Sequence, residues 1–228
     1  MMRRSILSDR RPAVITGVLL LVGLVAGLFS VVPVIDGADY LAKASTHENQ
    51  VLIGALSQLL MVVAYVGTPI VLYPLLSKHH KGVALGSVAF GIIAGVFIIM
   101  GVIILLLLLT LSHEFSNLGA SNGSYVQTLG GLLREGRDLV NHVATTLAFV
   151  LAMLLFNLIF HQTKIIPRWL SVLGLLGSTL SILASLLFMI RLIGLDASYM
   201  TLNVPIAIQQ LVLAIWLILK GFNRTEAI

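Results

Sequence analysis

The sequence predicts an all-α membrane protein: a polytopic bundle of six transmembrane helices. Of its 228 residues, 58% are hydrophobic and 10% are charged, and the mean hydropathy is +1.05. The charged residues fall between six long apolar segments. A soluble domain carries roughly a quarter charged residues, so the 14 Lys and Arg and 9 Asp and Glu of this chain are too few to cover a water-exposed surface.

Each apolar segment is long enough to cross the hydrocarbon core, which takes about 20 residues. The expected spans are 13–34, 51–76, 83–111, 139–160, 169–190 and 200–219, within a single domain over residues 1–228. None of them contains Asp, Glu, Lys or Arg. The first follows four arginines, but at about 22 residues it is longer than the apolar part of a signal peptide, so we expect it to be retained.

The sixth segment is the most polar of the six. Asn203, Pro205, Gln209 and Gln210 interrupt its apolar run. Proline is tolerated in membrane helices, where it produces kinks, and Pro69 in the second segment is a second kink position.

The charge distribution predicts the orientation. Successive connections lie on alternate sides of the membrane, so they form two sets. The set that includes both termini carries ten Lys and Arg, of which Lys220 and Arg224 are at the C-terminus, and the other set carries four. Positively charged connections stay in the cytoplasm, so we expect both termini to be cytoplasmic and the protein to lie in the cell membrane. The longest outer connection is 112–138, and we expect its part 125–134 to form a helix on the membrane surface.

Small residues indicate where helices pack. Membrane helices associate through close approach at such residues. Gly23 and Gly27, and Gly91 and Gly95, have the four-residue spacing of packing faces. In the fifth segment a narrow arc is made of Ser171, Gly174, Ser178, Ser181 and Ser185.

The fourth segment carries a polar stripe. Asp138, His142, Thr145, Thr146 and Asn157 fall within an arc of about 120° on an α-helix. Polar groups inside a membrane are costly unless they have partners, so each is a candidate for a substrate path. The alternative is that they only form hydrogen bonds between helices.

Shorter stripes occur in two other segments. The second segment has Gln58, Tyr65 and Thr68, and the sixth has Asn203 and Gln210, seven residues apart. The same two interpretations apply, and hydrogen bonding between helices is favoured for these stripes.

A metal site is an alternative at the outer boundary. The candidate ligands are His47, Glu48, His113, Glu114 and His142. Such side chains bind zinc, which activates water for hydrolysis. They lack the His-Glu-x-x-His spacing, however, and the pairs lie where polar residues are expected in any case.

Several function classes are excluded or unsupported. The sequence contains no cysteine, which removes disulfides and thiolate chemistry. No phosphate-binding glycine loop, nucleophile elbow or nucleic-acid-binding module is found. We therefore predict no catalytic residues, no cofactor and no nucleic-acid partner; membrane lipids are the expected partners, and a homo-oligomer or a membrane partner protein is left open.

The order of several apolar motifs resembles the bacterial membrane family catalogued as domain of unknown function 4386. The motifs are Leu72-Tyr73-Pro74-Leu75-Leu76, the glycine pair Gly82 and Gly86, Ile165-Ile166-Pro167-Arg168-Trp169-Leu170, and Trp216 with Lys220-Gly221. The stripe around His142 departs from the usual family pattern. The resemblance implies a six-helix single domain and no particular activity.

The sequence favours a non-enzymatic membrane protein, either a transporter of small molecules or lipids or an accessory protein in membrane stress. A membrane-embedded, metal-dependent hydrolase is the alternative, and a signalling or assembly partner is a third possibility. A transporter requires the stripes to face one another around a cavity, whereas a hydrolase requires the five metal candidates to converge within about 4–6 Å.

Overall fold

The computed structural model describes residues 2–118 and 123–223, and every regular element within these ranges is helical. Six helical segments are long and apolar enough to cross a membrane. The all-α fold and the predicted number of spans are therefore confirmed.

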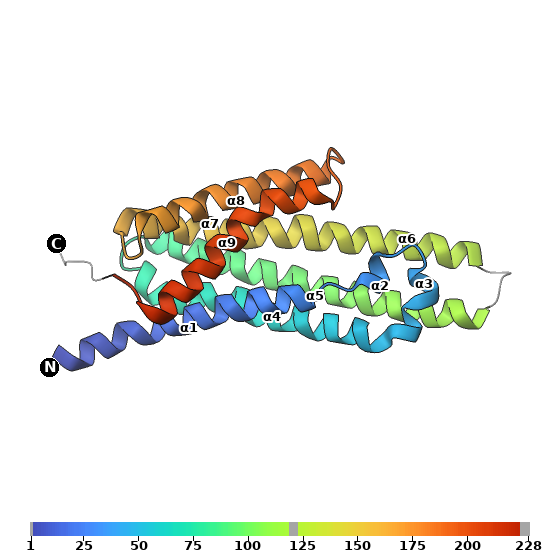
Figure 1. Ribbon diagram of the computed structural model, residues 1–228, viewed down its shortest axis with the longest axis horizontal. Helices are drawn as coiled ribbons and strands as arrows, with labels where there is room; N and C mark the ends of the chain where they lie inside the picture. The colour runs from blue at the N-terminus through green and yellow to red at the C-terminus, as the bar shows by residue number, and fades with distance from the viewer. Residues whose placement is uncertain (1, 119–122, 224–228) are drawn as a thin grey trace.

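The spans are long helices joined mostly by short connections (Figure 1). The first three are α1 (Met2–Phe29), α4 (Glu48–Leu76) and α5 (Lys81–Leu118). The fourth is continuous through α6 (Gly123–Leu139), a π-helical turn η3 (Val140–Thr145) and α7 (Thr146–Thr163). The last two are α8 (Arg168–Met189) and α9 (Ala197–Leu219). Between α1 and α4 lie the short helices α2 (Pro33–Asp36), α3 (Tyr40–Lys43) and η1 (Ser45–His47).

The first span ends five residues earlier than predicted, at Phe29 instead of residue 34. Pro33 explains the difference, because the residue before a proline is driven out of the helical region. Val32 has φ −120° and ψ 81°, and Pro33 begins the next helix, α2.

The predicted outer connection over 112–138 is helical over its described residues, 112–118 and 123–138, and its place outside the membrane stays a prediction. Helix α5 continues to Leu118, and α6 begins at Gly123 and runs on without a break into the fourth span. The segment expected on the membrane surface is helical, but it packs against α5. The cause is that the polar and apolar residues of this segment keep helical spacing, so the helix extends beyond the apolar run. Residues 119–122 and Arg224 lie outside the described residues.

The six spans form a closed ring. Each packs against the span before it and the span after it, and α9 packs against α1. The start of α1 and the end of α9 lie at the same end of the ring, which we call the terminal end (Figure 1). The opposite end, where α5 and α6 approach each other, is called the hairpin end.

The interior of the ring differs between its two ends. At the terminal end, buried apolar side chains from α1, α4, α7 and α9 form one cluster that includes Leu72, Phe156, Phe160 and Leu213. At the hairpin end, a second cluster joins α2 and α3 to α4, α5 and α6.

The predicted packing faces are confirmed at all but one position. A Cβ added to Gly91 would lie 2.7 Å from Pro69 Cγ, one added to Gly95 would lie 2.6 Å from Val66 Cγ2, and one added to Gly23 would lie 3.2 Å from Ala64 Cβ. The small residues of the fifth span are buried. The prediction is wrong for Gly27, where an added Cβ meets nothing within 4 Å.

Candidate functional site

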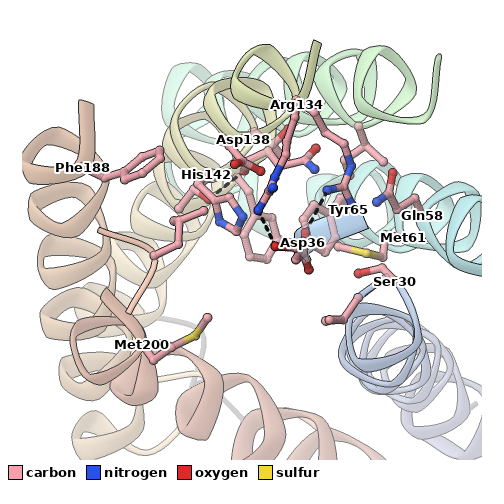
Figure 2. A pocket seen from close by; sticks show the side chains of 18 residues that line it. Ser30, Asp36, Gln58, Met61, Tyr65, Arg134, Asp138, His142, Phe188 and Met200 are labelled. Atoms are coloured by element: carbon pink, nitrogen blue, oxygen red, sulfur yellow. Dashed lines mark hydrogen bonds and ion pairs between the residues drawn. The ribbon is translucent and has the colours of Figure 1, made fainter. Parts of the chain in front are cut away.

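A cavity of about 660 Å³, called the chamber, lies inside the ring toward the hairpin end. The last five spans, α2 and the two residues that follow α1 contribute to its wall. Figure 2 shows Ser30, just after α1, and Met200 of α9 on opposite sides of the space, with Asp138 and His142 on the wall between them.

The fourth span forms the longest part of the wall. From Arg134 to Phe149, residues at successive helical turns line the chamber. At 1.5 Å per residue this is about 22 Å of helix, so the chamber follows the fourth span over several helical turns.

The π-helical turn η3 lies in this wall. Such turns are rare and often occur at functional sites. The backbone carbonyl of His142 accepts hydrogen bonds from Ser185 Oγ of α8 (2.8 Å) and from Tyr199 OH of α9 (3.1 Å). The imidazole of His142 meets the rings of Tyr199 and Phe188 edge to face, at centroid distances of 5.4 and 6.2 Å. The turn therefore connects three spans at one point.

Charged side chains line the mouth of the chamber. Arg137 Nη1 lies 3.6 Å from Asp36 Oδ1. Arg134 donates to the backbone carbonyls of Asp36 and Gly37, the latter at 3.1 Å, and its guanidinium lies 5.5 Å from the ring centroid of Tyr40. Both arginines thus hold the α2–α3 segment against the fourth span.

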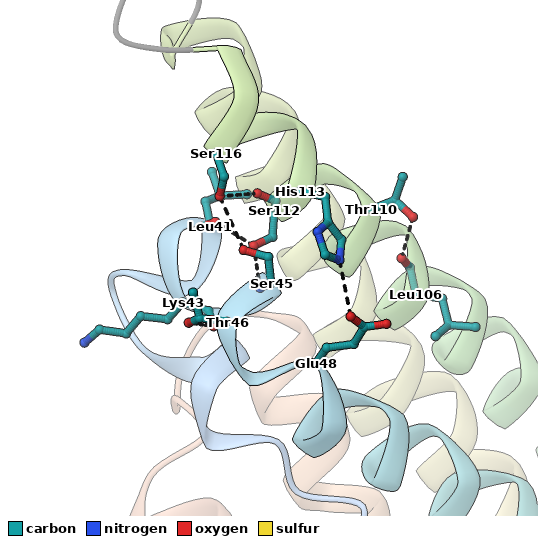
Figure 3. A network of polar contacts seen from close by, with 10 residues as sticks. All are labelled: Leu41, Lys43, Ser45, Thr46, Glu48, Leu106, Thr110, Ser112, His113 and Ser116. Carbon is teal, nitrogen blue, oxygen red and sulfur yellow. Dashed lines mark hydrogen bonds and ion pairs between the residues drawn. The ribbon is translucent and has the colours of Figure 1, made fainter.

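The α2–α3 segment is also fixed to α5 by serines (Figure 3). Ser112 Oγ donates to Leu41 O (2.6 Å) and accepts from Ser45 N (2.8 Å). Ser45 Oγ and Ser116 Oγ are 3.3 Å apart. These contacts determine where Asp36 lies, because α2 and α3 are too short to hold a position alone.

Three buried side chains in the chamber wall have polar atoms without a partner among the described residues. They are Arg137 Nε, Gln58 Oε1 and Thr145 Oγ1. Arg137 and Gln58 are each 5% exposed, and Thr145 is 7% exposed. Six other buried polar atoms without a partner lie outside the chamber, on Thr16, Thr68, Ser178, Ser181, Gln209 and Trp216. Unpartnered polar atoms are therefore spread through the described bundle and are not confined to the chamber.

A second, smaller cavity of about 280 Å³ adjoins the chamber. We call it the slot. Tyr65, Thr146 and Phe149 line both cavities, and the rings of Tyr65 and Phe149 are stacked with centroids 3.8 Å apart. The rest of the slot is mostly apolar residues of α1, α7 and α9, with Asn203 and Gln210 at its polar side.

The slot lies where α1 and α9 separate. Toward the terminal end these helices touch, since a Cβ on Gly17 would lie 2.7 Å from Ala214 O. At Gly27, near the other end of α1, an added Cβ would meet nothing within 4 Å. The two helices therefore close the ring at the terminal end and leave it open toward the hairpin end.

The structure brings together most of the residues of the predicted stripes. Gln58, Tyr65, Asp138, His142 and Thr146 line the chamber. Asn203 and Gln210 line the slot, where Gln210 Nε2 lies 3.2 Å from Met153 Sδ and Asn203 Nδ2 donates to Tyr199 O at 2.9 Å. Their role in a substrate path stays a prediction.

Asn157 lies apart from both cavities. It is fully buried among apolar residues toward the terminal end. Its Oδ1 accepts from Gln209 Nε2 (3.2 Å), and its Nδ2 donates to Met153 O (2.9 Å). Asn157 therefore forms a hydrogen bond between helices, which was the alternative to a place in a substrate path.

Sequence reasoning missed Arg134, Arg137 and Asp36, because it placed all three outside the predicted spans, Arg134 in the expected surface helix and the other two in connections. A signal was present for the two arginines. Arg134, Arg137 and Asp138 continue the helical spacing of Asn141, His142 and Thr145. No comparable signal places Asp36, whose position depends on contacts with α5 and α6.

The five metal candidates do not converge. His113 Nε2 lies 3.8 Å from Glu48 Oε2 (Figure 3), whereas His47 Nδ1 contacts Lys43 O at 3.0 Å and His142 lies in the chamber. Among residues 2–118 and 123–223 there is no group of three His, Cys, Asp or Glu side chains placed to hold a metal ion. The geometry that the hydrolase hypothesis requires is therefore not formed by these residues.

The fold and the site together define a polytopic membrane protein with a polar chamber inside its helix ring. The chain belongs to the family described as Domain of unknown function (DUF4386), whose model matches residues 15–221. This confirms the resemblance seen in the sequence. No curated protein and no solved structure matches the chain.

Proposed function

We propose that this protein binds an amphipathic small molecule, a lipid or a lipid-like compound, in the chamber and the slot and moves it across or out of the membrane. The observation that carries the proposal is the polar chamber inside a ring of membrane helices, whose wall includes two arginines and two aspartates. A bundle that used its polar residues only for packing would pair these charges with one another, whereas Arg137 with Asp36 is the one ion pair among them in the described residues.

The two ends of the ring support a transport role. The chamber adjoins the hairpin end, while Phe156, Phe160 and their neighbours fill the terminal end. A transporter alternates between states that are open to one side, around a site near the middle of the membrane. The present arrangement corresponds to one such state.

The orientation is part of the proposal: both termini are cytoplasmic, and the chamber opens to the outer side of the cell membrane. It is supported by the excess of Lys and Arg in the connections at the terminal end. Because the chain has no cysteine, single cysteines test it directly. On intact cells, a membrane-impermeant maleimide should label Tyr125→Cys and should leave His79→Cys unlabelled until the membrane is opened. The reverse pattern would refute the orientation.

Water access to the chamber is tested with two adjacent residues. Met61 lines the chamber, whereas Leu60 is 54% exposed on the outside of the ring. A charged thiol reagent should modify Met61→Cys at least about tenfold faster than Leu60→Cys, because thiols react as thiolates, which form in water and not in hydrocarbon. Equal, slow reaction at both positions would show that the chamber is closed to water, and the packing interpretation would then replace the proposal.

Transport itself is measured in proteoliposomes with a fluorescent short-chain phospholipid as the probe. The wild-type protein should move the probe faster than protein-free vesicles do. A bulky maleimide on Met61→Cys should abolish the difference, and the same label on Tyr125→Cys, which is 74% exposed at the hairpin end, should not. Movement at the rate of empty vesicles would refute the transport role.

A further inference from the structure

The charged side chains of the chamber wall restrict what can bind there. A guanidinium donates only, and an ionised carboxylate accepts only. Arg134, Arg137 and Asp138 all line the chamber. A ligand that pairs with both kinds of group must carry an acceptor for the arginines and a donor for the aspartate.

The charges of the wall point to the same kind of ligand. Two arginines, Arg134 and Arg137, and two aspartates, Asp36 and Asp138, line the chamber. Only one opposite pair among them is within ion-pair distance, Arg137 with Asp36 at 3.6 Å. Arg134 is bonded to backbone carbonyls, and Asp138 has no ion pair or hydrogen bond with any described residue.

Arg134 and Asp138 are therefore left without an ion-pair partner within the described ranges. A ligand with one anionic and one cationic group complements them, whereas a simple anion would leave Asp138 unpaired and a simple cation would leave Arg134 unpaired. Charge-assisted hydrogen bonds are roughly twice as strong as neutral ones, so both ends of such a ligand contribute.

The slot adds an apolar requirement. It continues from the chamber past Tyr65 and Phe149, and apolar residues of α1, α7 and α9 form most of its wall. Gly27 lines it and leaves open space where a side chain would be. A ligand with a charged head in the chamber can therefore place a hydrocarbon chain in the slot.

From these observations we propose that the chamber binds a phospholipid with a phosphoethanolamine head group. The phosphate accepts from Arg137 and Arg134, the primary ammonium donates to Asp138, and one acyl chain occupies the slot. A phosphocholine head lacks N–H donors for Asp138, and a phosphoglycerol head lacks the cation for Asp138. The inference rests on the proposed function and specifies the substrate class of the same site.

The first test is head-group preference in the unmodified protein. Short-chain phosphatidylethanolamine, phosphatidylcholine and phosphatidylglycerol are titrated into the detergent-solubilised full chain, and binding is read by native mass spectrometry. Phosphatidylethanolamine should bind about tenfold more tightly than the other two, the equivalent of one charge-assisted hydrogen bond. Equal affinities, or tightest binding of phosphatidylglycerol, would overturn the inference.

The second test is the carboxylate of Asp138. Asp138→Asn should weaken phosphatidylethanolamine binding about tenfold and leave phosphatidylglycerol binding unchanged. The matched control is Asp39→Asn, which makes the same change at an exposed residue of the same end, paired with Lys43 at 3.2 Å. If both variants bind phosphatidylethanolamine as tightly as the wild type does, Asp138 does not bind the ammonium group. The head-group preference of the wild type decides the question if Asp138→Asn fails to fold.

The third test separates a lipid from a free head group. Gly27→Leu places a side chain in the slot, and Gly82→Leu makes the same change where an added Cβ also meets nothing within 4 Å. Only Gly27→Leu should weaken lipid binding. Glycerophosphoethanolamine, which has no acyl chain, should bind weakly to the wild type and equally to both variants. If it binds as tightly as the lipid, the ligand is a water-soluble zwitterion and the lipid assignment is wrong.

The failure of this inference differs from the failure of the proposed function. If another amphiphile binds in place of phosphatidylethanolamine and Met61→Cys reacts from water, the transport proposal stands and only the head-group assignment falls. If no amphiphile binds and Met61→Cys is unreactive, both fall.

Discussion

The contact between α8 and α9 supports a prediction with a magnitude worked from the structure. A Cβ added to Gly177 would lie 2.7 Å from Ile206 N, 2.8 Å from Ile206 Cα and 3.0 Å from the carbonyl carbon of Pro205. All three atoms are backbone, so no side chain can turn away to make room. In the variant Gly177→Ala, α9 must shift as a whole.

Overpacking of this kind costs about 1–3 kcal/mol, and three backbone contacts place Gly177→Ala near the upper value. Alanine is favoured over glycine within a helix by about 1 kcal/mol. We therefore expect a net destabilisation of about 2 kcal/mol.

Gly27→Ala is the matched control, since its Cβ meets nothing within 4 Å. It gains the same helix preference without the clash, so it should be stabilised by up to about 1 kcal/mol. The difference between the two variants, about 3 kcal/mol, isolates the clash. Unfolding by SDS in mixed micelles, followed by circular dichroism, measures both. Equal stability of the two variants would refute the close approach of α8 and α9.

Two further predictions concern hydrogen bonds and pH. Ser185→Ala and Tyr199→Phe each remove one of the two side-chain donors to His142 O. Each variant should lose about 0.6 kcal/mol of stability in the same unfolding assay. The double variant should lose more than the sum of the two, because only it leaves the carbonyl without either donor. Strict additivity would show that the two bonds do not share this role. In α3, burial raises the pKa of Tyr40, and the positive charge of Arg134 partly opposes the rise. Since the folded protein holds this proton more tightly, the contribution of Tyr40 is present below the pKa of the unfolded chain and is lost as pH rises through the folded pKa. The fall in stability at alkaline pH should therefore be smaller in Tyr40→Phe, and an unchanged fall would contradict the assignment.

The spans could be predicted because one physical requirement dominates them. A helix in lipid needs about 20 apolar residues and tolerates few charges, and these two conditions are visible in a sequence. The same two conditions explain why the ends of some predicted spans were wrong. The fourth span begins well before residue 139 because its polar part, which includes Arg134 and Arg137, faces the chamber and α2 instead of lipid.

The candidate site could be predicted in part. The spacing of Asp138, His142 and Thr146 showed that they share one side of a helix. It did not show that Gln58 and Tyr65 of α4 lie across from them, or that Asn157 lies outside both cavities. Those relations depend on how the helices are rotated against one another. In a membrane, positions that face lipid and positions that face other helices are both apolar, so hydrophobicity does not reveal the rotation.

The sequence by itself therefore determined the number of spans, their approximate positions, the charge difference between the two sets of connections, and the shared side of the polar residues in the fourth span. Only the tertiary structure decided that the spans close into a ring, that α1 and α9 separate at Gly27, and that Arg134, Arg137 and Asp36 meet at the mouth of the chamber. The physical reason is that span positions follow from the free energy of transferring individual residues into lipid, which depends only on the local sequence. The chamber arises from contacts between helices far apart in the chain, where a single glycine or proline determines how closely two backbones approach.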